Sequence, residues 1–563
     1  MLESELNQDF FIQPGRALLI LEAENQLTQT PSESSALRRD TASEEWPIIW
    51  DTRKIPDLDR KMIFIARKTN RFNSHNLVAE LLNKGHLVIA EEDALRNLYN
   101  DYKINSSHWF TETKEHPYLL LCESSEIARD ILLRNICSVQ HTNWTTLAIT
   151  GTNGKTSTTQ IAGALLQELS QQPVLRIGTL GVQVGSHNWH NPFPTMPDYP
   201  GLLAALRAAK SNFNCHQLVM EATSIGLMEN RLGDWPVGCG AYLNLTQDHL
   251  DYHGTMDKYF EAKSLLFKRH LSTQGQVIIN CIDPYWGKAL EAAKGKQRLC
   301  IGFGSPLNKE LFFQLSRSFF SDQQFLEFQP LSTTTSGIRG YWTLWRDATT
   351  HLAQSQYHVR LLGSVQHENL TAAAAMMISL GYPLNQVTNS THAISPIPGR
   401  LEPVETGTSS LNQPCVLVDY AHSPDALQKT IATCRTMIED GGRLICVFGC
   451  GGDRDASKRP KMGRIASQLA DEVWVTSDNP RTESPEKILQ DILSGPKKDD
   501  AKKVKSHVDR KMAIRGAILS AHEKDIVLIA GKGHEDYQII GTTKYPFSDL
   551  EVARLALVEK FKS

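Results

Sequence analysis

Short apolar runs separated by polar stretches begin near Trp46 and follow the pattern of a small α/β domain. PIIWDTR at 47–53, MIFIAR at 62–67 and HLVIAEE at 86–92 are typical of buried strands. NLVAELLNKG at 76–85 has helical apolar spacing and ends in a glycine. We therefore predict one domain over 46–142. The residues before it, 1–45, become rich in Ser, Thr and Glu and predict a mobile N-terminal extension.

A second pattern alternates strand-like and helix-like segments over 143–394. Such alternation predicts a parallel sheet with crossover helices. The strand-like runs are TTLAIT at 145–150, HQLVMEA at 216–222, GAYLNL at 240–245 and GQVIIN at 275–280, and the helical ones are QIAGALLQELS at 160–170 and LTAAAAMMISLGY at 370–382.

The alternation restarts after ISPIPGR at 394–400, whose prolines and glycine are typical of a linker. We predict a second, smaller doubly wound domain over 395–563. Its strand-like runs are CVLVDYA, LICVFGC, EVWVTSD and DIVLIAG, beginning at Cys415, Leu444, Glu472 and Asp525. SGPKKDDAKKVKSH at 494–507 mixes both charges and predicts a solvated surface.

Composition excludes several classes of protein. The 563 residues are 41% hydrophobic and 21% charged, and 59 basic residues face 62 acidic ones. We expect no nucleic-acid partner from this balance. Ten scattered cysteines make no disulfide framework. The acidic start differs from a signal peptide, and no stretch of about 18 apolar residues predicts a membrane span. We expect a cytoplasmic, soluble monomer that acts on small molecules.

A phosphate-binding loop is predicted between the strand at 145–150 and the helix after it. Its glycines allow backbone N–H groups to turn toward phosphate oxygens, and the helix N-terminus adds positive potential. Lys155 supplies a point charge, and the Thr156 hydroxyl can bind Mg²⁺. The alternative is a tight turn with an incidental lysine, because the loop is shorter than GxxxxGK[ST]. The run consists of Gly151, Thr152, Asn153, Gly154, Lys155 and Thr156.

Three downstream features can complete a magnesium nucleotide site. Glu221 follows a predicted parallel strand, at the end where open α/β sheets place ligands. His249 lies in the acid- and histidine-rich run 248–253, and Lys263 lies in the helical pattern YFEAKSLLF. Each has a plainer interpretation. Such a glutamate is more often a helix cap, Mg²⁺ prefers oxygen ligands to histidine, and a helical lysine usually faces solvent.

The chain resembles the Mur ligases, the ATP-dependent enzymes that build the peptidoglycan stem peptide. The resemblance runs from about Trp46 to the C-terminus. It implies three domains: a small N-terminal α/β domain that binds a UDP-sugar, a central P-loop ATPase-like domain with a parallel sheet, and a C-terminal Rossmann-like domain. The runs that carry it are TGTNGKTSTTQ, NLTQDHLDYHGTMDKYFEAK, VDYAHSPDAL, CVFGCGGDRD, DNPRTE and AGKGHEDYQI.

The resemblance also implies a mechanism and its residues. ATP would phosphorylate the acceptor carboxylate, and an incoming amine would displace phosphate from that acyl phosphate. Thr156, Glu221 and His249 match the family's metal ligands. Lys263 matches a lysine that CO2 converts to a carbamate, and Lys155, His249 and Lys263 are the expected catalytic residues. The positions that match the family's ATP site, beside the loop itself, are Thr158, Asn369, Arg400, Asp419 and His422.

The added amino acid is indicated by DNPR at 478–481. Arg481 offers a planar fork for a carboxylate, which meso-diaminopimelate has at its distal end and lysine lacks. The resembling enzymes with this motif add diaminopimelate to UDP-N-acetylmuramoyl-L-alanyl-D-glutamate. The alternative is a turn with a surface arginine. The expected amino-acid pocket comprises Arg454, Asp478, Asn479, Pro480, Arg481, Gly531 and Glu535.

The acceptor pocket departs most from the family pattern. Met196 stands for a threonine, and Thr223 and Glu229 lie in altered runs, as does Gln366 near the nucleotide site. Three interpretations remain open: a diaminopimelate ligase, a paralogous ligase with another acceptor, and a nucleotide-binding pseudoenzyme. The expected UDP-sugar contacts are Thr52, Thr195, Met196, Thr223, Glu229 and Arg231.

Overall fold

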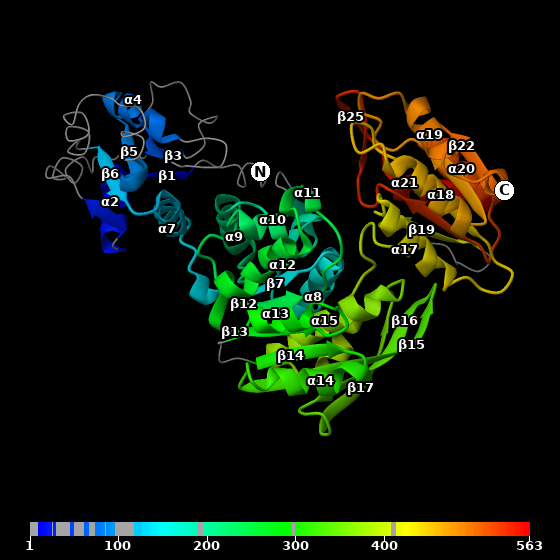
Figure 1. Cartoon of the computed structure of the whole chain (residues 1–563), viewed down its shortest axis with the longest axis horizontal. Coiled ribbons are helices and arrows are strands. Elements are labelled where there is room, and N and C mark those ends of the chain that lie inside the picture. The colour runs from blue at the N-terminus through cyan, green and yellow to red at the C-terminus, as the bar shows by residue number, and fades with distance from the viewer. Residues whose placement is uncertain are drawn as a thin grey trace. The chain divides into compact units, whose positions relative to one another are not determined.

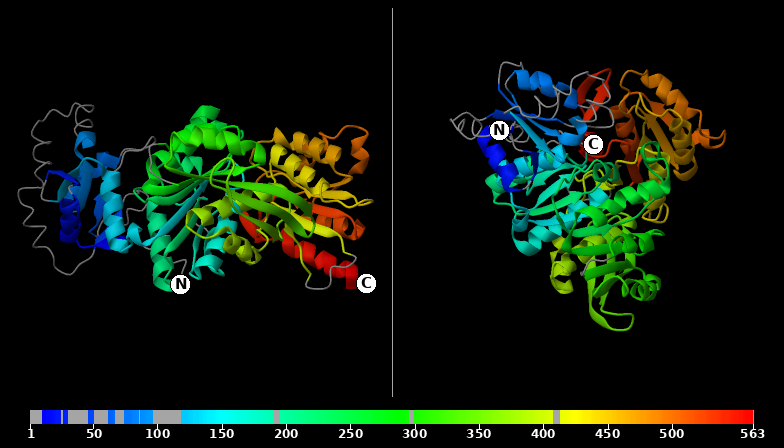
Figure 2. Two further views of the ribbon diagram at one scale, coloured as in Figure 1. Left: turned by 90° about the horizontal axis from the view of Figure 1, so that it is seen from below. Right: turned by 60° about the vertical axis from the view of Figure 1, so that its left-hand side comes forward.

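The computed structural model describes residues 10–24, 26–29, 46–49, 61–66, 74–84, 86–95, 118–189, 195–294, 299–406 and 413–562. Helices and strands alternate along these residues, as predicted for an α/β protein (Figures 1 and 2). The chain divides into two compact units. The first comprises Met1–Ala148, Gln172–Gly238 and Leu250–Ser272, and the second comprises Ile149–Gln171, Cys239–His249 and Thr273–Ser563.

The first unit begins with a six-stranded sheet in the order β1-β3-β4-β5-β6-β2. Its four central strands are parallel, and β1 and β2 pair antiparallel at the edges. Phe64, Val88 and Leu121 pack into an apolar cluster with Val78 and Leu81 of the covering helix. The strands are Phe10–Ile12 (β1), Leu27–Gln29 (β2), Trp46–Ile49 (β3), Ile63–Ile65 (β4), Leu87–Glu91 (β5) and Leu119–Cys122 (β6). The helices are Pro14–Ala23 (α2), Ser74–Leu77 (η2), Val78–Asn83 (α4), Ser125–Cys137 (α7) and His141–Asn143 (η3).

Part of the predicted N-terminal extension belongs to this sheet. β1 pairs with β3, β2 pairs with β6, and Ala17, Leu18 and Leu21 of α2 are buried. The prediction of a mobile extension over 1–45 is therefore wrong for Phe10–Ile12, Pro14–Ala23 and Leu27–Gln29. The edge strands are only three residues long, too short for a clear alternation. Residues 1–9 and 30–45 lie outside the described residues.

The rest of the first unit carries strands β8 to β11 and the helices that follow them. β8 is parallel to β11, whereas β9 pairs antiparallel with both β8 and β10. Asp198, Thr223 and Thr255 cap helices by accepting a hydrogen bond from a backbone N–H of the first turn. The elements are Leu175–Gly178 (β8), Gly181–Val184 (β9), His187–Trp189 (β10), Tyr199–Phe213 (α9), Gln217–Glu221 (β11), Ser224–Met228 (α10), Leu250–His253 (α11), Met256–Leu265 (α12) and Leu266–His270 (η4, a π-helix).

The central sheet has the strand order β10-β9-β8-β11-β7-β12-β13-β14-β15-β16-β17 among the described residues. Parallel pairing continues from β13 through β15, as predicted. Its remaining strands are Thr145–Thr150 (β7), Val237–Tyr242 (β12), Leu271–Asn280 (β13), Leu299–Gly304 (β14), Asp322–Thr334 (β15), Gly337–Trp345 (β16) and His351–Val359 (β17). The helices of this region in the second unit are Lys155–Ser170 (α8), Trp286–Ala292 (α13), Pro306–Ser316 (α14), Val365–Ser379 (α15), Leu384–Asn389 (α16) and Ser390–Ala393 (η5).

The antiparallel extension β15-β16-β17 was not predicted from the sequence pattern. These strands pair antiparallel, and the register shifts between Pro330 and Ser332. Only one face of β16 is largely buried, so its apolar residues alternate with polar ones. Polar β17 carries little of the apolar signal that marks a buried strand.

The C-terminal domain contains a six-stranded sheet in the order β18-β19-β23-β20-β21-β22. Five strands are parallel, and β18 is antiparallel. Leu417 and Val418 belong to two different apolar clusters, so each face of the sheet has its own core, as predicted for a doubly wound domain. The strands of this sheet are Glu402–Pro403 (β18), Cys415–Asp419 (β19), Leu444–Phe448 (β20), Glu472–Thr476 (β21), Val504–His507 (β22) and Ile526–Ala530 (β23). Tyr537–Ile540 (β24) and Thr543–Pro546 (β25) form a separate two-stranded sheet. The helices are Pro424–Arg435 (α17), Lys458–Leu469 (α18), Pro485–Leu493 (α19), Asp500–Lys503 (η6), Arg510–Ser520 (α20) and Asp549–Lys562 (α21).

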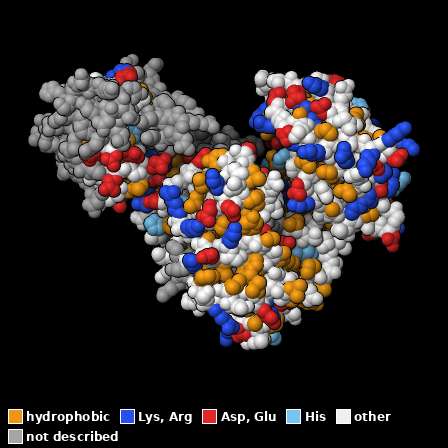
Figure 3. All heavy atoms as spheres, in the orientation of Figure 1, with side chains coloured by type: hydrophobic (Ala, Val, Ile, Leu, Met, Phe, Trp, Pro, Cys, Tyr) orange, Lys and Arg blue, Asp and Glu red, His pale blue; other side chains and the backbone are white. Residues whose placement is uncertain are grey.

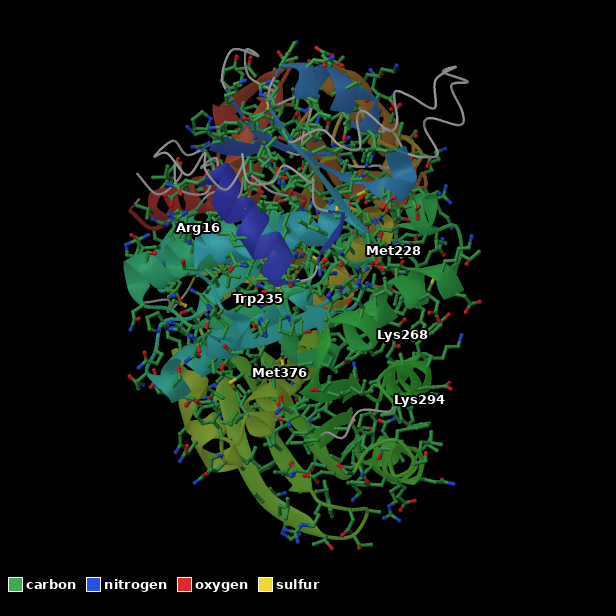
Figure 4. All side chains as sticks on the ribbon, turned by 90° about the vertical axis from the view of Figure 1, so that its left-hand side faces the viewer. Arg16, Met228, Trp235, Lys268, Lys294 and Met376 are labelled. Carbon is green, nitrogen blue, oxygen red and sulfur yellow. The ribbon has the colours of Figure 1, made fainter. Side chains whose placement is uncertain are left out.

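The surface bears out the mixed charge of the sequence. On the face drawn in Figure 3, basic and acidic side chains intermingle. Trp235 and Met376, marked in Figure 4, are buried, whereas the Lys294 side chain is exposed. Within the parts of the chain that the structure describes, no helix combines the length and apolar character needed to cross a bilayer. The boundaries 46–142, 143–394 and 395–563 stay predictions.

Candidate functional site

The predicted phosphate loop joins β7 to α8, and Gly154 caps the helix with a positive φ of 86°. Two glycines of the loop meet close neighbours. A Cβ on Gly154 would lie 2.4 Å from Oδ1 of Asn369, and a Cβ on Gly151 would lie 2.9 Å from Cβ of Leu243. The loop therefore requires glycine for close packing as well as for backbone conformation.

Asn244 and Thr246, which were not predicted as site residues, fix the conformation of this loop. Asn244 exchanges two hydrogen bonds with the backbone of Asn153, accepting from its N at 2.8 Å and donating to its O at 3.1 Å. Thr246 N donates to Oγ1 of Thr152 at 3.0 Å. Both residues follow β12 in the run NLTQ, and their only sequence signal was their place after a buried strand. The loop is thus held in shape by protein contacts alone.

Lys155 begins α8 and folds back over the loop. Its Nζ donates to the carbonyl oxygens of Gly151 at 2.9 Å and Thr152 at 2.8 Å. The amine is thereby held at the mouth of the loop, above the first turn of α8. Thr156, the next residue, is buried. This arrangement can present a cation and backbone N–H groups to a phosphate chain.

Asn369 of α15 reaches the loop from a distant part of the sequence. Oγ1 of Thr158 lies 3.5 Å from Oδ1 of Asn369, and Nδ2 of Asn369 donates to Oε1 of Gln366 at 3.0 Å. All three side chains are buried. Gln366, which departs from the family pattern, therefore orients the Asn369 amide.

Glu221 ends β11 and is only 1% exposed. Its Oε1 accepts from the backbone N of Thr179 at 2.7 Å, and its Oε2 from the hydroxyl of that residue at 3.3 Å. A Cβ on Gly178 would lie 2.2 Å from Oε1 of Glu221, so the carboxylate fills the space above a glycine. A buried carboxylate that accepts hydrogen bonds from neutral donors suits a divalent cation.

His249 takes a left-handed backbone conformation, with φ of 50°. Its N donates to Oδ1 of Asp248 at 2.9 Å, and its Nε2 lies 3.5 Å from the other oxygen of that carboxylate. The side chain is about half exposed, so it can reach a ligand. Among the described residues, no three His, Cys, Asp or Glu side chains form a metal cluster.

Lys263 departs from the expectation for a helical lysine, because it is 1% exposed. Its Nζ lies 4.4 Å from the ring centroid of Tyr259, one turn earlier on α12. The His253 ring packs on the same tyrosine, with centroids 5.0 Å apart, and its Nε2 lies 3.0 Å from Oγ of Ser224. The plainer interpretation of Lys263, a solvent-facing lysine, is therefore wrong.

The expected acceptor residues of the first unit are partly brought together. Nη1 of Arg231 donates to the Met196 carbonyl oxygen at 2.7 Å, and its Nε donates to Oε2 of Glu229 at 2.9 Å. The Met196 side chain is fully buried, and its Sδ lies 3.9 Å from Oγ1 of Thr223. Thr195 lies 3.5 Å from Thr179 between hydroxyl oxygens. Thr52 lies outside the described residues.

Three expected nucleotide-site residues lie near the first strands of the C-terminal domain: Arg400, Asp419 and His422. Asp419 accepts from the backbone N of Leu401 and of Ala421, each at 2.9 Å, and burial raises the pKa of its carboxyl. Nη2 of Arg400 lies 3.5 Å from Oγ1 of Thr156. His422 is exposed, and its Nδ1 lies 2.9 Å from its neighbour's carbonyl oxygen. Asp419 thus fixes the backbone at Leu401 and Ala421, while Arg400 and His422 have polar side chains that can contact a ligand.

Several residues of the amino-acid pocket expected from DNPR lie close together within the C-terminal domain. Nη1 of Arg481 donates to the Gly452 carbonyl oxygen at 2.8 Å, and φ of this arginine is 51°. Nδ2 of Asn479 donates to Oε2 of Glu535 at 2.9 Å. A Cβ on Gly531 would lie 2.8 Å from Oδ2 of Asp478.

Two neighbouring glycines, Gly451 and Gly452, pack tightly against residues of this expected pocket. A Cβ on Gly451 would lie 3.0 Å from Nη1 of Arg481 and 3.9 Å from Cγ of Arg454. The carbonyl oxygen of Pro480 lies 1.9 Å from the Cβ position of Gly452, which demands glycine there. Lys532 is fully buried beside Glu535 and was missed, because a lysine between two glycines resembles a loop residue.

Family models and known proteins match long stretches of this chain. The family model of the Mur ligase middle domain matches residues 149–377, and that of the Mur ligase glutamate ligase domain matches residues 399–533. A UDP-N-acetylmuramoyl-L-alanyl-D-glutamate–2,6-diaminopimelate ligase of Trichormus variabilis is 40% identical over 424 residues, which cover 74% of this chain and 77% of that one. The ligase of the same name from Gloeobacter violaceus is 40% identical over 418 residues, covering 74% and 78%.

Solved structures show the same fold. A structure of UDP-N-acetylmuramoyl-L-alanyl-D-glutamate–2,6-diaminopimelate ligase aligns with a TM-score of 0.61 and 26% identity, covering 92% of this chain and 95% of its own. Folylpolyglutamate synthase of Mycobacterium tuberculosis, solved with ADP and AMPPCP, aligns with a TM-score of 0.52 and 16% identity, covering 76% and 94%. The second likeness concerns the fold alone.

Proposed function

Because the chain belongs to the Mur ligase family and is therefore a ligase, we propose that it adds meso-2,6-diaminopimelate to UDP-N-acetylmuramoyl-L-alanyl-D-glutamate with ATP. The observation that carries this choice of amino acid is the pocket of the C-terminal domain. There Asn479 donates to Glu535, and Arg481 donates to the Gly452 carbonyl oxygen. The Arg481 guanidinium can bind the carboxylate of an amino-acid end group, and the Glu535 carboxylate can bind its ammonium.

The reaction proceeds in two steps. The γ-phosphoryl group of ATP moves to an oxygen of the D-glutamate carboxylate, giving an acyl phosphate and ADP. The free amine of diaminopimelate then attacks the acyl carbon, phosphate leaves with the electrons of the C–O bond, and the nitrogen loses a proton. Positioning and charge stabilisation carry most of such catalysis.

The phosphate loop has the groups that this reaction needs. The backbone N–H groups at the start of α8 would bind the phosphates, and the Lys155 ammonium lies beside the carbonyl oxygens of Gly151 and Thr152. Asn369, oriented by Gln366, keeps the glycine turn in place. These contacts hold the loop ready before a nucleotide binds, so little order is lost on binding.

Mg²⁺ and a carbamate on Lys263 belong to this proposal. Mg²⁺ prefers oxygen donors, which Thr156 and the buried Glu221 would supply, and the family pattern adds His249 as a further expected ligand. Bound Mg²⁺ would neutralise charge on the transferring phosphoryl group. A carbamate on the buried Lys263 would turn this cation into an anion. Arg400, Asp419 and His422 complete the nucleotide side.

One alternative is favoured by a specific observation, the altered acceptor residues. The Met196 side chain is buried, and Arg231 is already paired with Glu229. Of the expected contacts, Thr52, Thr195 and Thr223 then remain to bind the phosphates and sugar of a UDP-linked acceptor. A related ligase that uses another acceptor carboxylate would show this pattern.

Phosphate release separates the two functions. The protein is incubated with ATP, Mg²⁺ and UDP-N-acetylmuramoyl-L-alanyl-D-glutamate, with either meso-diaminopimelate or L-lysine. Release that requires both the UDP-sugar and diaminopimelate is the expected result. Release that requires lysine instead would overturn the choice of amino acid. No release with either, in protein that binds ATP, would favour another acceptor.

A further inference from the structure

Lys532 is a fully buried lysine in the amino-acid pocket, with 0% of its surface exposed. Its Nζ donates to Oδ1 of Asn479 at 3.1 Å and to Oε2 of Glu535 at 3.0 Å. The same amine lies 5.5 Å from the ring centroid of Tyr537. A buried ammonium is costly unless it is paired, so these contacts imply a specific role for the charge.

The amine fixes the Asn479 amide in one orientation. Oδ1 of Asn479 accepts from both Nζ of Lys532 and the backbone N of Ile539, the latter at 3.0 Å. Nδ2 therefore points to Glu535 and donates to its Oε2 at 2.9 Å. Flipping the amide would place Nδ2 against two donors. Both hydrogen bonds to Glu535 end on Oε2, and its Oε1 takes part in neither.

Two acidic and two basic side chains around Asn479 are buried or half-buried. Asp478 and Glu535 are the acidic ones and Lys532 and Arg481 the basic ones, whereas Arg454 is exposed to solvent. Burial raises the pKa of Tyr537, the carboxylates of Glu535, Asp536 and Asp478 raise it further, and Arg481 lowers it, so these charges act on one ring. Arg510 of α20 is also buried nearby, but it is paired with Asp549 of α21. Its Nε and Nη2 donate to the two oxygens of that carboxylate, each at 2.7 Å.

We propose that Lys532 determines substrate specificity, by keeping the pocket neutral so that it selects an amino-acid end group carrying both an ammonium and a carboxylate. The inference rests on the proposed function and deepens it. A neutral pocket gains little from a ligand end that brings only an ammonium, as lysine does. With Lys532 removed, Glu535 and Asp478 would outweigh Arg481, and a bare ammonium would be attracted. Lys532 acts through its neighbours and is a specificity residue, not a catalytic one.

The test measures kcat/KM for meso-diaminopimelate and for L-lysine in the phosphate-release assay, at saturating ATP and UDP-sugar. In Lys532→Met the ratio of the two constants falls by about tenfold or more, while KM for ATP is unchanged. Lys532→Arg keeps the charge and most of the ratio. Lys544→Met is the matched control, because its Nζ lies 4.3 Å from the centroid of the same Tyr537 ring yet its side chain is exposed.

Glu535→Gln gives the opposite sign and covers the case in which Lys532→Met does not fold. It leaves an extra positive charge, so the ratio rises above the wild-type value even as both constants fall. Equal loss with both amino acids in each variant would overturn the proposal and assign Lys532 a structural role. If the wild-type protein turns over neither amino acid, the proposed function fails instead. In that case, diaminopimelate binding by calorimetry still tests Lys532.

Discussion

Asn369 and Gly154 lie so close together that a single methyl group would not fit between them. A Cβ on Gly154 would be 2.4 Å from Oδ1 of Asn369, and φ of this glycine is 86°. The phosphate loop is therefore held by a side chain more than two hundred residues away in sequence. Its shape depends on the packing of α15 as much as on its own glycines.

Replacing this glycine should weaken nucleotide binding strongly. In Gly154→Ala, the new methyl group displaces Asn369 and strains the backbone by about 1–2 kcal/mol. We expect the affinity for a non-hydrolysable ATP analogue, measured by calorimetry, to fall about a hundredfold. Gly381→Ala is the control, because φ there is 95° but a Cβ would meet no atom within 4 Å. Equal affinity in the two variants would show that neither the conformation of Gly154 nor its contact with Asn369 determines nucleotide binding.

The orientation of Asn369 can be tested through Gln366. Gln366→Leu removes the acceptor for Nδ2 of Asn369, leaving a buried donor unpaired at a cost of about 1–3 kcal/mol. We expect roughly tenfold weaker binding of the ATP analogue, whereas Gln366→Glu, which keeps an acceptor, should bind nearly normally. Normal binding by the leucine variant would mean that packing alone orients the amide.

The sequence predicted what depends on local pattern and missed what depends on long-range packing. The phosphate loop, the doubly wound C-terminal sheet and the strand before Glu221 carry strong local signals. The burial of Lys263 does not, because a helical lysine has the same local sequence whether Tyr259 or water faces it. Asn244 was missed for a similar reason, since its partner Asn153 lies on another strand's loop.

Lys263 is expected to be essential for turnover but not for nucleotide binding. Lys263→Ala should abolish phosphate release while ATP binding, measured separately, largely survives. The carbamate itself can be detected by ¹³C NMR after incubation with labelled bicarbonate. Lys258→Ala, an exposed lysine of the same helix, should keep both the activity and the signal. Full activity in Lys263→Ala would contradict the carbamate assignment.

Arg481 is expected to determine the preference for diaminopimelate over lysine. In Arg481→Ala the distal carboxylate of diaminopimelate loses its guanidinium partner. We therefore expect kcat/KM for diaminopimelate to fall about a hundredfold, and kcat/KM for lysine to fall less. Arg515→Ala removes an arginine that pairs with Glu559, and should leave the preference unchanged. An unchanged preference in Arg481→Ala would mean that the distal carboxylate is bound elsewhere.

A buried histidine links α15 to the antiparallel extension. Nδ1 of His367 lies 2.6 Å from the hydroxyl oxygen of Tyr357, and its Nε2 lies 3.2 Å from the hydroxyl oxygen of Thr333. The Phe328 ring stacks on it with an interplanar angle of 6°. Burial lowers the pKa of His367 from 6.5 to about 4, so the folded protein holds it neutral.

This histidine should make the protein less stable in mild acid. Between pH 6.5 and about 4 the unfolded chain binds a proton that folded His367 does not bind, so stability falls as pH falls. The total loss from this group is about 3 kcal/mol. His270, whose pKa burial also lowers to about 4, adds a similar loss in the same range. Urea unfolding of His367→Gln across this range should therefore show a shallower slope than wild type, despite lower stability at pH 7. The exposed His351→Gln should keep the wild-type slope, and an unchanged slope in His367→Gln would place the acid sensitivity elsewhere.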